Sequence, residues 1–419
     1  MMMPDEIVNS IEALIAATTD TAIRRIVVSG ALADAPSFRL SPGQSLYGED
    51  DDASISFTVG SDGVQLSSDN LVHDICLHAS PENRAIFNDT GVAGFGRIEL
   101  YDVTVTGRVQ ILARDKVRGG HIEIDGLDII AADARGETER PQGYGVHVLQ
   151  GAFTLWNMQP DAAVTISAEL VGLSAGRPSA PVRGSGIFVS GAGDTGGRLV
   201  VSRLETDAVY SDGGIAPGTA DQITGGVFTV YGAYVDLVRN RGPVVTYGVN
   251  DMVLDNWGVV DRWIAEEKIT SYGPSGIGFV NFGIVNELTA SALIETFGQG
   301  ARGFNVYTGT VNVAKFDRVV THADGAVGIQ ISQPIGRLTV RRGIETFGGT
   351  GPSLVKGKVV TLSAVALSIK PGGSAREITI AGGIRTNGAG VAPIEQFGTI
   401  DLMKVSGGFV AAGGGFDKI

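Results

Sequence analysis

The segment Ile294-Glu295-Thr296-Phe297-Gly298 returns further along the chain as Ile344-Glu345-Thr346-Phe347-Gly348. Weaker copies lie at 245–248, 270–273 and 384–388. The glycines that close this series follow one another in nearly even steps, at positions 248, 273, 298, 325 and 348. A second glycine series runs in phase with the first, at positions 232, 258, 283, 309 and 336. The chain therefore repeats a unit of about 25 residues.

Each unit contains three short strands with glycine at the turns between them. Such strands are too short to be stable alone. If the units wind into a coil, each strand pairs with its equivalent one turn away, about 4.8 Å along the axis. Glycine suits the corners because it accepts positive φ. The sequence therefore predicts an all-β fold, a single-stranded right-handed parallel β-helix with coils of about 25 residues.

The N-terminal stretch, residues 1–25, is expected to form a capping helix and a lead-in. Ile7, Ile11, Leu14 and Ile15 recur at helical spacing, and a helix here would cover the open edge of the first coil. No basic region precedes its short apolar run, so the stretch does not read as a signal peptide. No apolar run is long enough to span a membrane. A cytoplasmic protein without membrane contact is expected.

The coils themselves fall into two parts. Residues 26–225 are predicted to form irregular coils with long loops, because insertions interrupt the strands at 131–143, 174–184 and 211–225. Residues 226–419 are predicted to form regular coils up to the C-terminal end. Loops on a rigid scaffold carry function more often than the scaffold does, so the insertions are expected to wall a groove.

Composition narrows the classes of partner. The 419 residues carry a net charge of −13 and no dense Lys/Arg run, which argues against nucleic acid and polyanions and favours a neutral ligand. The single cysteine, Cys76, excludes a disulfide framework within one chain. The five histidines show no metal-ligand spacing, so we expect neither a metal nor another cofactor.

Three segments of the N-terminal half look like the opening coils of pectate-lyase-like β-helix proteins: Leu40–Gly48, Asp62–Leu66 and Leu71–Ile75. The later Ile-x-Thr-x-Gly rhythm is also similar to autotransporter passenger repeats. The first resemblance implies a right-handed parallel β-helix of that superfamily. The paired-Asp and Gly-His-Gly motifs of polygalacturonases are absent, and so are clear Ca²⁺ clusters of the lyase type. The resemblance therefore implies a fold rather than a specific reaction.

Two series of aromatic residues follow the repeat. If Ile294 points inward, the outward row contains Tyr247, Tyr272, Phe297 and Phe347, interrupted at 322–324. A second series ends other strands, with an inward or outward direction that the sequence leaves open: Tyr231, Trp257, Phe282 and Tyr307. Exposed rings suit flat sugar faces, so Tyr247, Tyr272, Phe297 and Trp257 are candidate substrate-binding residues. The alternatives are core stacks or contacts between subunits.

Glu295 and Glu345 fall on one outward row, two coils and therefore roughly 9–10 Å apart. The coil between them carries His322 and Asp324, which break the aromatic rhythm. A carboxylate pair at about 6.5–9.5 Å suits an inverting glycosidase, and pairs on neighbouring coils suit a retaining one. These four residues are candidate catalytic groups. The alternative is that they are solvated residues of the outer surface.

A second candidate cluster surrounds Trp257. Asp251 and Asp255 lie beside this tryptophan, and carboxylates beside large rings are common in sugar sites. Asp212 begins a long loop and is a candidate substrate contact, as is Arg302. The alternative for each carboxylate is a role in a turn.

These patterns favour an enzyme that cleaves or transfers glycosidic bonds of a neutral oligo- or polysaccharide by carboxylate acid/base chemistry, as a glycoside hydrolase or an intramolecular glycosyl transferase. One alternative is a non-catalytic β-helix module of the structural or adhesin type. Another is a polysaccharide lyase with Lys370 or Arg302 as its base. A homo-oligomer, such as a trimer with parallel axes, is expected, and the aromatic rows are then candidates for its interface. Which sugar and which linkage are recognised does not follow from the sequence.

Overall fold

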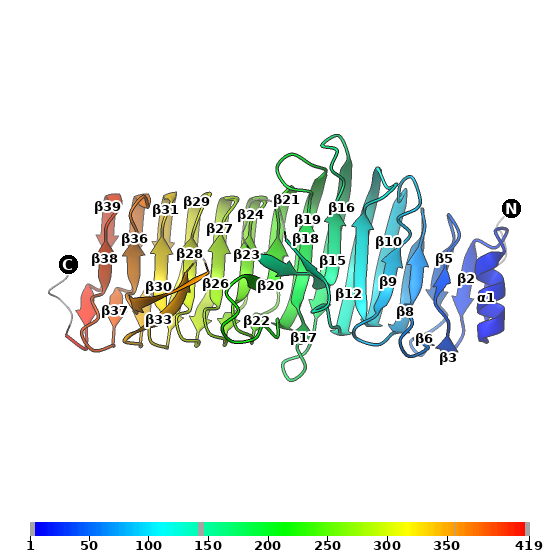
Figure 1. Ribbon diagram of the computed structural model, residues 1–419, viewed down its shortest axis with the longest axis horizontal. Coiled ribbons are helices and arrows are strands. Elements are labelled where there is room, and N and C mark those ends of the chain that lie inside the picture. Colours follow the sequence, from blue (N-terminus) through cyan, green and yellow to red (C-terminus); the bar gives the residue numbers. More distant parts are fainter. Residues whose placement is uncertain (1–4, 141–145, 356, 415–419) are drawn as a thin grey trace.

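Parallel strands account for nearly all regular structure in the chain. The computed structural model describes residues 5–140, 146–355 and 357–414, and it is an elongated solenoid of parallel strands (Figure 1). The expectation of an all-β chain with a single N-terminal helix is confirmed for these residues. That helix, α1 (Ile11–Thr19), has nine residues, and no helix in the described part of the chain is long and apolar enough to cross a bilayer.

Two long sheets make the sides of the solenoid. Sheet A wraps two sides, because long strands such as β27 (Ile284–Thr296) bend through a register shift between Ala290 and Leu293. Sheet B forms the remaining side and includes β11 (Arg108–Ala113), β23 (Asp251–Asn256) and β26 (Ile277–Asn281). Side chains from all sides meet in one apolar interior that runs along the axis.

The pairing register preserves the repeat seen in the sequence. Ile269 pairs with Ile294, and Val319 pairs with Ile344, each one repeat further along the chain. Ile344 then pairs with Ile384, a longer step along the chain, because an antiparallel hairpin of β33 (Thr350–Val355) and β34 (Lys358–Ser363) is inserted there. Equivalent residues therefore still pair across the insertion, as Thr346 does with Thr386.

Glycine recurs at the corners for two reasons, only one of which the sequence predicts. Gly309 has φ +65°, as expected for a left-handed corner. At Gly298 the reason is the close approach of successive coils, because an added Cβ would lie 1.8 Å from the carbonyl oxygen of Gly273. The glycine series is therefore set partly by backbone contact between coils.

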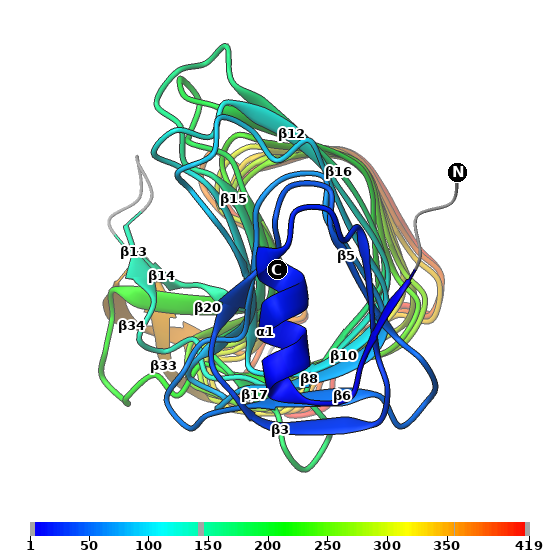
Figure 2. The same cartoon turned by 90° about the vertical axis from the view of Figure 1, so that its right-hand side faces the viewer.

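The helix α1 lies across the first coil, as Figure 2 shows end-on. Ser10 caps it, with its hydroxyl accepting from the backbone N–H of Ala13 at 3.2 Å. The buried amide of Gln44 donates to carbonyls in and just after the helix, those of Ala17, Asp20 and Ile23, at 3.0–3.1 Å. The assignment of Ile7 to the helical stripe was wrong. The Ser10 cap starts the helix after it, so Ile7 lies in β1 (Glu6–Val8) and is exposed.

Sheet B is covered on its outer face as well as its inner face. Its strands β23 and β26 are buried at every position. The cover consists of β13 (Thr138–Glu139) with β14 (His147–Leu149), and of the β33–β34 hairpin, which lie together on one side of the coil in Figure 2. A second apolar cluster, separate from the interior, fills part of the space beneath. The predicted insertion at 131–143 supplies part of this cover, although 141–143 lie outside the described residues.

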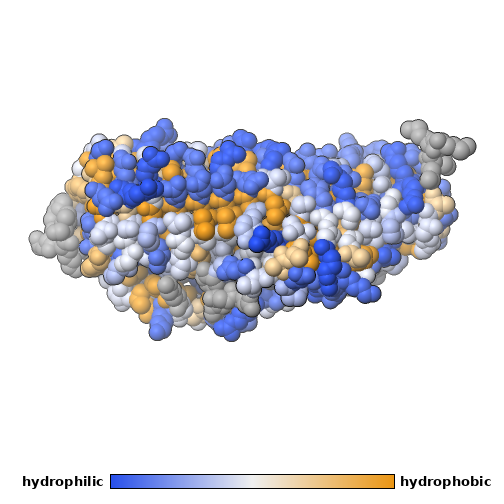
Figure 3. Space-filling view, turned by 90° about the horizontal axis from the view of Figure 1, so that it is seen from above, coloured by the Kyte–Doolittle hydropathy of each residue, from blue (hydrophilic) through white to orange (hydrophobic). Residues whose placement is uncertain are grey.

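Seen from above, the C-terminal half of the coil carries a band of apolar side chains parallel to its axis (Figure 3). Val259 and Ile284, which pair with each other on successive coils of this half of the chain, are exposed apolar residues. The band offers apolar area for the subunit contact that the sequence predicts. That prediction stays open.

Candidate functional site

The outer face of sheet B carries one continuous row of outward side chains whose character changes along the axis. Register places these residues one coil apart, in the order Gln65, Phe87, Gln110, Thr154, Phe188, Phe228, Asp255, Val280, Asn305 and Gln330. Polar residues dominate the N-terminal half, and aromatic and aliphatic residues dominate the centre. Two cavities follow this division, one polar and one apolar.

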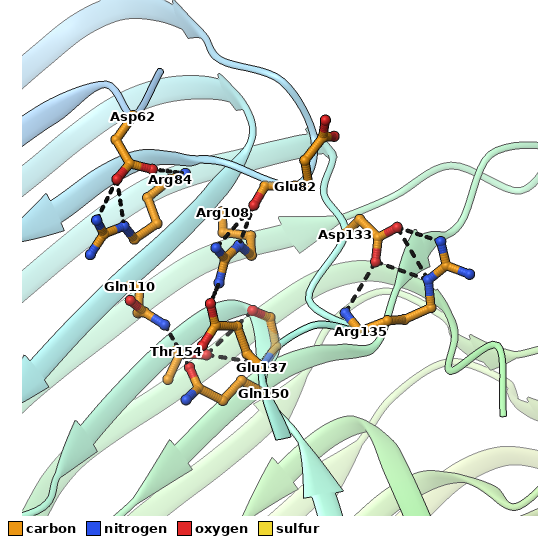
Figure 4. A network of polar contacts seen from close by, with 11 residues as sticks. Asp62, Glu82, Arg84, Arg108, Gln110, Asp133, Arg135, Glu137, Gln150 and Thr154 are labelled. Carbon is orange, nitrogen blue, oxygen red and sulfur yellow. Dashed lines mark hydrogen bonds and ion pairs between the residues drawn. The ribbon is translucent and has the colours of Figure 1, made fainter. Parts of the chain in front are cut away.

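The polar cavity has a volume of about 380 Å³. Its charged lining side chains are three arginines and three carboxylates: Arg84, Arg108, Arg114, Asp62, Glu137 and Glu139. Three amides, those of Asn83, Gln110 and Gln150, also line it. Figure 4 shows most of these groups converging from separate coils. The charges of its described lining residues cancel.

Asp62 and Arg84 form one wall of the polar cavity. Arg84 Nε donates to Asp62 Oδ2 at 3.0 Å, and the backbone N–H of Arg84 donates to Asp62 Oδ1 at 2.8 Å. Partial burial by itself would raise the pKa of Asp62, but the hydrogen bonds from Arg84 outweigh it and hold that pKa below its ordinary value. Asp62 is therefore a fixed carboxylate.

Arg108 and Glu137 form the opposite part of the network in Figure 4. Arg108 is buried and its Nη1 lies 2.9 Å from Glu137 Oε1, while its Nε and Nη2 donate to the carbonyl oxygen of Glu82. Gln110 Nε2 donates to Gln150 Oε1 at 2.8 Å. A buried guanidinium with these partners is held in one orientation.

Sequence reasoning missed this cavity. Its residues come from coils in the irregular half of the chain and share no fixed spacing. One signal was present in β11, where Arg108 and Gln110 alternate with the apolar Val109 and Ile111. Polar residues at alternate positions of a buried strand indicate a polar surface on the outer side.

The apolar cavity lies further along the same face and has a volume of about 390 Å³. Trp257, Phe282 and Tyr307 line it, with ring centroids 5.5 Å and 5.2 Å apart in that order. The second aromatic series therefore lies on the outer face of sheet B, which the sequence left open. Leu354 of the β33–β34 hairpin contributes to its cover.

Asp255 lies beneath the apolar cavity, between Phe228 and Val280 of the outward row. Its side chain is fully buried. Burial raises its pKa well above the ordinary value, and a hydrogen bond with the Trp257 side chain opposes this only in part. Burial therefore favours the protonated, neutral form of the Asp255 carboxyl group. The sequence grouped it correctly with Trp257, but the structure places it under the cavity wall.

Asp251 is also buried, and its carboxyl group is occupied by the protein itself. It accepts the backbone N–H groups of Gly213 and Gly248 at 2.9 and 2.8 Å and the hydroxyl of Thr224 at 2.5 Å. Burial raises its pKa to about 6, against these hydrogen bonds. These contacts tie the start of the 213–222 segment to the coil and leave no accessible carboxyl group for the catalytic role that the sequence predicts for Asp251.

The outward direction of the first aromatic row is confirmed. The rings stack through Tyr247, Tyr272, Phe297, His322 and Phe347, with successive centroids 5.4, 5.0, 4.5 and 5.2 Å apart and planes within 12° of parallel. His322 therefore continues the row rather than breaking it. Because each inner ring has a neighbour on both faces, the row presents ring edges to solvent. A sugar face has no free ring face on which to stack at Tyr272 or Phe297.

Glu295 and Glu345 point outward on one row, with Val320 between them, as the repeat predicts. Glu295 accepts from Lys268 at 3.1 Å and contacts His322 Nε2 at 2.9 Å. Although partial burial would raise it, these partners lower the pKa of Glu295, which makes it a poor proton donor. The Glu345 carboxylate also forms an ion pair, with the Arg318 guanidinium at 2.7 Å.

The remaining predicted residues lie apart from one another. Asp324 is exposed, and its Oδ1 accepts the backbone N–H of Gly349 on the next coil at 2.6 Å. The Asp212 carboxylate lies 2.5 Å from the Arg183 guanidinium. Asp212 occupies the same outward row as Tyr247, one coil earlier. Arg302 is fully buried beneath the β33–β34 hairpin, where its Nη2 donates to Ser353 Oγ at 2.9 Å. The structure therefore does not assemble the predicted catalytic residues into one site.

Comparisons of the chain with protein-family models, with curated proteins and with solved structures found no match. Within the described residues, no cluster of three or more His, Cys, Asp or Glu side chains is arranged to hold a metal ion. The candidate site is therefore argued from its own geometry: a charge-balanced polar cavity and an apolar cavity on one face of one sheet.

Proposed function

We propose that the chain binds a neutral saccharide in the polar cavity and cleaves a glycosidic bond there. The observation that supports this is the lining: three guanidinium groups, three carboxylates and three amides around about 380 Å³. Sugar hydroxyls both donate and accept, and planar polar side chains supply both functions in fixed directions. The balance of charge favours a neutral sugar over a uronate or a sulfated one.

Glu137 and Glu139 are the proposed catalytic carboxylates. They stand two residues apart at the edge of the cavity, so their Cα atoms are separated by roughly 6.8 Å in an extended chain. Side chains two residues apart in an extended chain project to the same side, so the two carboxyl groups can reach the separation of about 6.5–9.5 Å that inverting hydrolysis needs. In that reaction one carboxyl group protonates the leaving oxygen while the other activates water. These residues take the place of Glu295 and Glu345 in the proposal.

Mass analysis of products from a panel of neutral oligosaccharides tests the proposal. We expect new products with the unaltered chain and their loss in Glu137→Gln and Glu139→Gln, with binding retained in calorimetry. Glu295→Gln is the matched control and is expected to keep full turnover. Loss of turnover in that control, with normal turnover in Glu137→Gln, would move the site to the outer row of Glu295. Absence of both binding and turnover across the panel would refute the proposal.

A non-catalytic saccharide-binding module is the second candidate. It is favoured by the engagement of Glu137 by Arg108 and of Asp62 by Arg84, which holds both carboxylates in place without substrate. Binding without turnover, with loss of affinity in Arg108→Gln, would support it. An unsaturated product detected by ultraviolet absorbance would instead indicate a lyase.

We also propose that the solenoid is a right-handed parallel β-helix of the pectate-lyase-like kind, with the coil length expected from the glycine repeat. The pairing of equivalent positions on successive repeats, such as Ile269 with Ile294, supports that coil length. Right-handed crossover between parallel strands is the strong general rule. An experimental structure tests the hand directly.

A further inference from the structure

The apolar cavity is a feature that saccharide binding in the polar cavity does not use. Its lining side chains are mostly aromatic or aliphatic, including Met252, Ile277, Val280, Trp257 and Leu354. The cavity has a volume of about 390 Å³ and is partly open to solvent, so its apolar lining can be reached from outside. A concave, mostly apolar surface with a few polar groups at its edge is the usual form of a small-molecule site.

The walls of this cavity come from distant parts of the chain. The floor belongs to β23 and β26 of sheet B, and the corner residues Tyr307 and Thr308 close one side. The cover comes from Ala220 and Ile223 and from the β33–β34 hairpin. Ser275 Oγ accepts the backbone N–H of Leu354 at 3.4 Å, and Asn250 Nδ2 donates to the carbonyl oxygen of Gln222 at 2.7 Å. These bonds hold both covering segments over the floor.

The charge around the cavity limits what it can hold. Asp221 is exposed at the rim, and none of the described lining residues is basic. Among the described lining residues, an anionic head group would meet this carboxylate without a cation to pair with it. Asn250, Ser275 and Thr308 offer polar side chains at the edge of the apolar surface, which suit a hydroxyl group.

We propose that this cavity is a binding site for an uncharged hydrophobic small molecule with one hydroxyl-like polar end. Its apolar part lies against Trp257, Val280 and Ile277, and its polar end lies at the rim near Asp221 and Asn250. The site is distinct from the polar cavity, so it stands or falls independently of the proposed saccharide function. Both sites lie on one face of sheet B.

Fluorescence of N-phenyl-1-naphthylamine tests the proposal, followed by displacement with n-decanol and with decanoate at pH 8. We expect saturable binding of the probe to the full chain and displacement by decanol. We expect decanoate to require at least about tenfold higher concentration, since its charge meets Asp221. Displacement by decanoate as effective as that by decanol would overturn the assignment of an uncharged ligand.

A pair of hairpin variants locates the site. Leu354 and Val359 face each other across the hairpin, but Leu354 lines the cavity whereas Val359 is exposed. Leu354→Trp fills the space and is expected to weaken probe binding more than tenfold, while Val359→Trp is expected to leave it unchanged. Circular dichroism confirms that both variants fold. No saturable binding to the unaltered chain, or equal effects of the two variants, would refute the proposal.

Discussion

Replacing Asp251 by asparagine changes how the stability of the fold depends on pH. The folded state raises the pKa of Asp251 from 3.8 to about 6, so the folded chain holds this proton more tightly than the unfolded chain does. The protonated side chain therefore adds stability that is fully present below about pH 4 and is lost as the pH rises through 6. A shift of this size corresponds to about 3 kcal/mol in total, of which about 2 kcal/mol falls between pH 4.5 and 7.5.

Asparagine imitates the protonated acid in this position. The asparagine oxygen can accept the N–H groups of Gly213 and Gly248. Its amide nitrogen can donate to the Thr224 hydroxyl, which then accepts a hydrogen bond instead of donating one. The Asp251→Asn variant should therefore keep the local hydrogen bonds and lose the pH-dependent cost of a buried charge. It should gain stability relative to the unaltered chain as the pH rises.

Urea unfolding followed by tryptophan fluorescence measures the effect at pH 4.5, 5.5, 6.5 and 7.5. The difference in unfolding free energy between variant and unaltered chain should move by about 2 kcal/mol across this range, in favour of the variant. Titrating groups that do not interact with Asp251 cancel in this difference, whereas Asp212, whose charge raises the pKa of Asp251, does not. Asp324→Asn, at an exposed turn, is the control for loss of one negative charge. Parallel profiles for the unaltered chain and Asp251→Asn would refute the reasoning.

Three further changes test the scaffold. Gln44→Ala removes the donor to three carbonyls at the N-terminal cap and should cost about 2–3 kcal/mol, with faster hydrogen exchange confined at first to residues 11–19. His322→Ala interrupts the ring stack and should cost about 1–2 kcal/mol in urea unfolding; an unchanged midpoint would mean that the stack adds nothing to stability. Gly298→Ala should prevent normal folding or cost more than about 3 kcal/mol because two coils would collide, whereas Gly119→Ala, with open space around it, should be neutral in thermal melts.

The coil and the outward rows follow from the sequence because both depend on spacing alone. Glycines recurring once per repeat place Ile294 and Ile344 on one inward row, and alternation along the strand then directs Glu295 and Phe297 outward. The orientation of the aromatic rings on these rows does not follow from spacing. Whether a ring offers its face or its edge depends on how rings on adjacent coils stack.

The candidate site could not be predicted because covering segments create it. Asp255 sits in a strand whose sequence gives no sign that its outer face is buried. The β33–β34 hairpin, which helps to cover that face, begins several coils later in the chain, at Thr350. The polar cavity likewise joins Asp62 to Glu137, which belong to coils without a regular repeat. Contacts of this kind depend on loop paths, and local sequence preferences do not determine loop paths.

The hairpin inserted after Ile344 has an evolutionary consequence. It adds residues to one coil, yet Ile344 still pairs with its equivalent on the next coil, so the insertion leaves the backbone ladder intact. Changes in its length or sequence can therefore reshape the roof of a ligand cavity at little cost to the scaffold beneath. Diversification of specificity in such a protein would be concentrated in a few grafted segments, and exchange of residues 350–363 between chains is a direct route to new ligands.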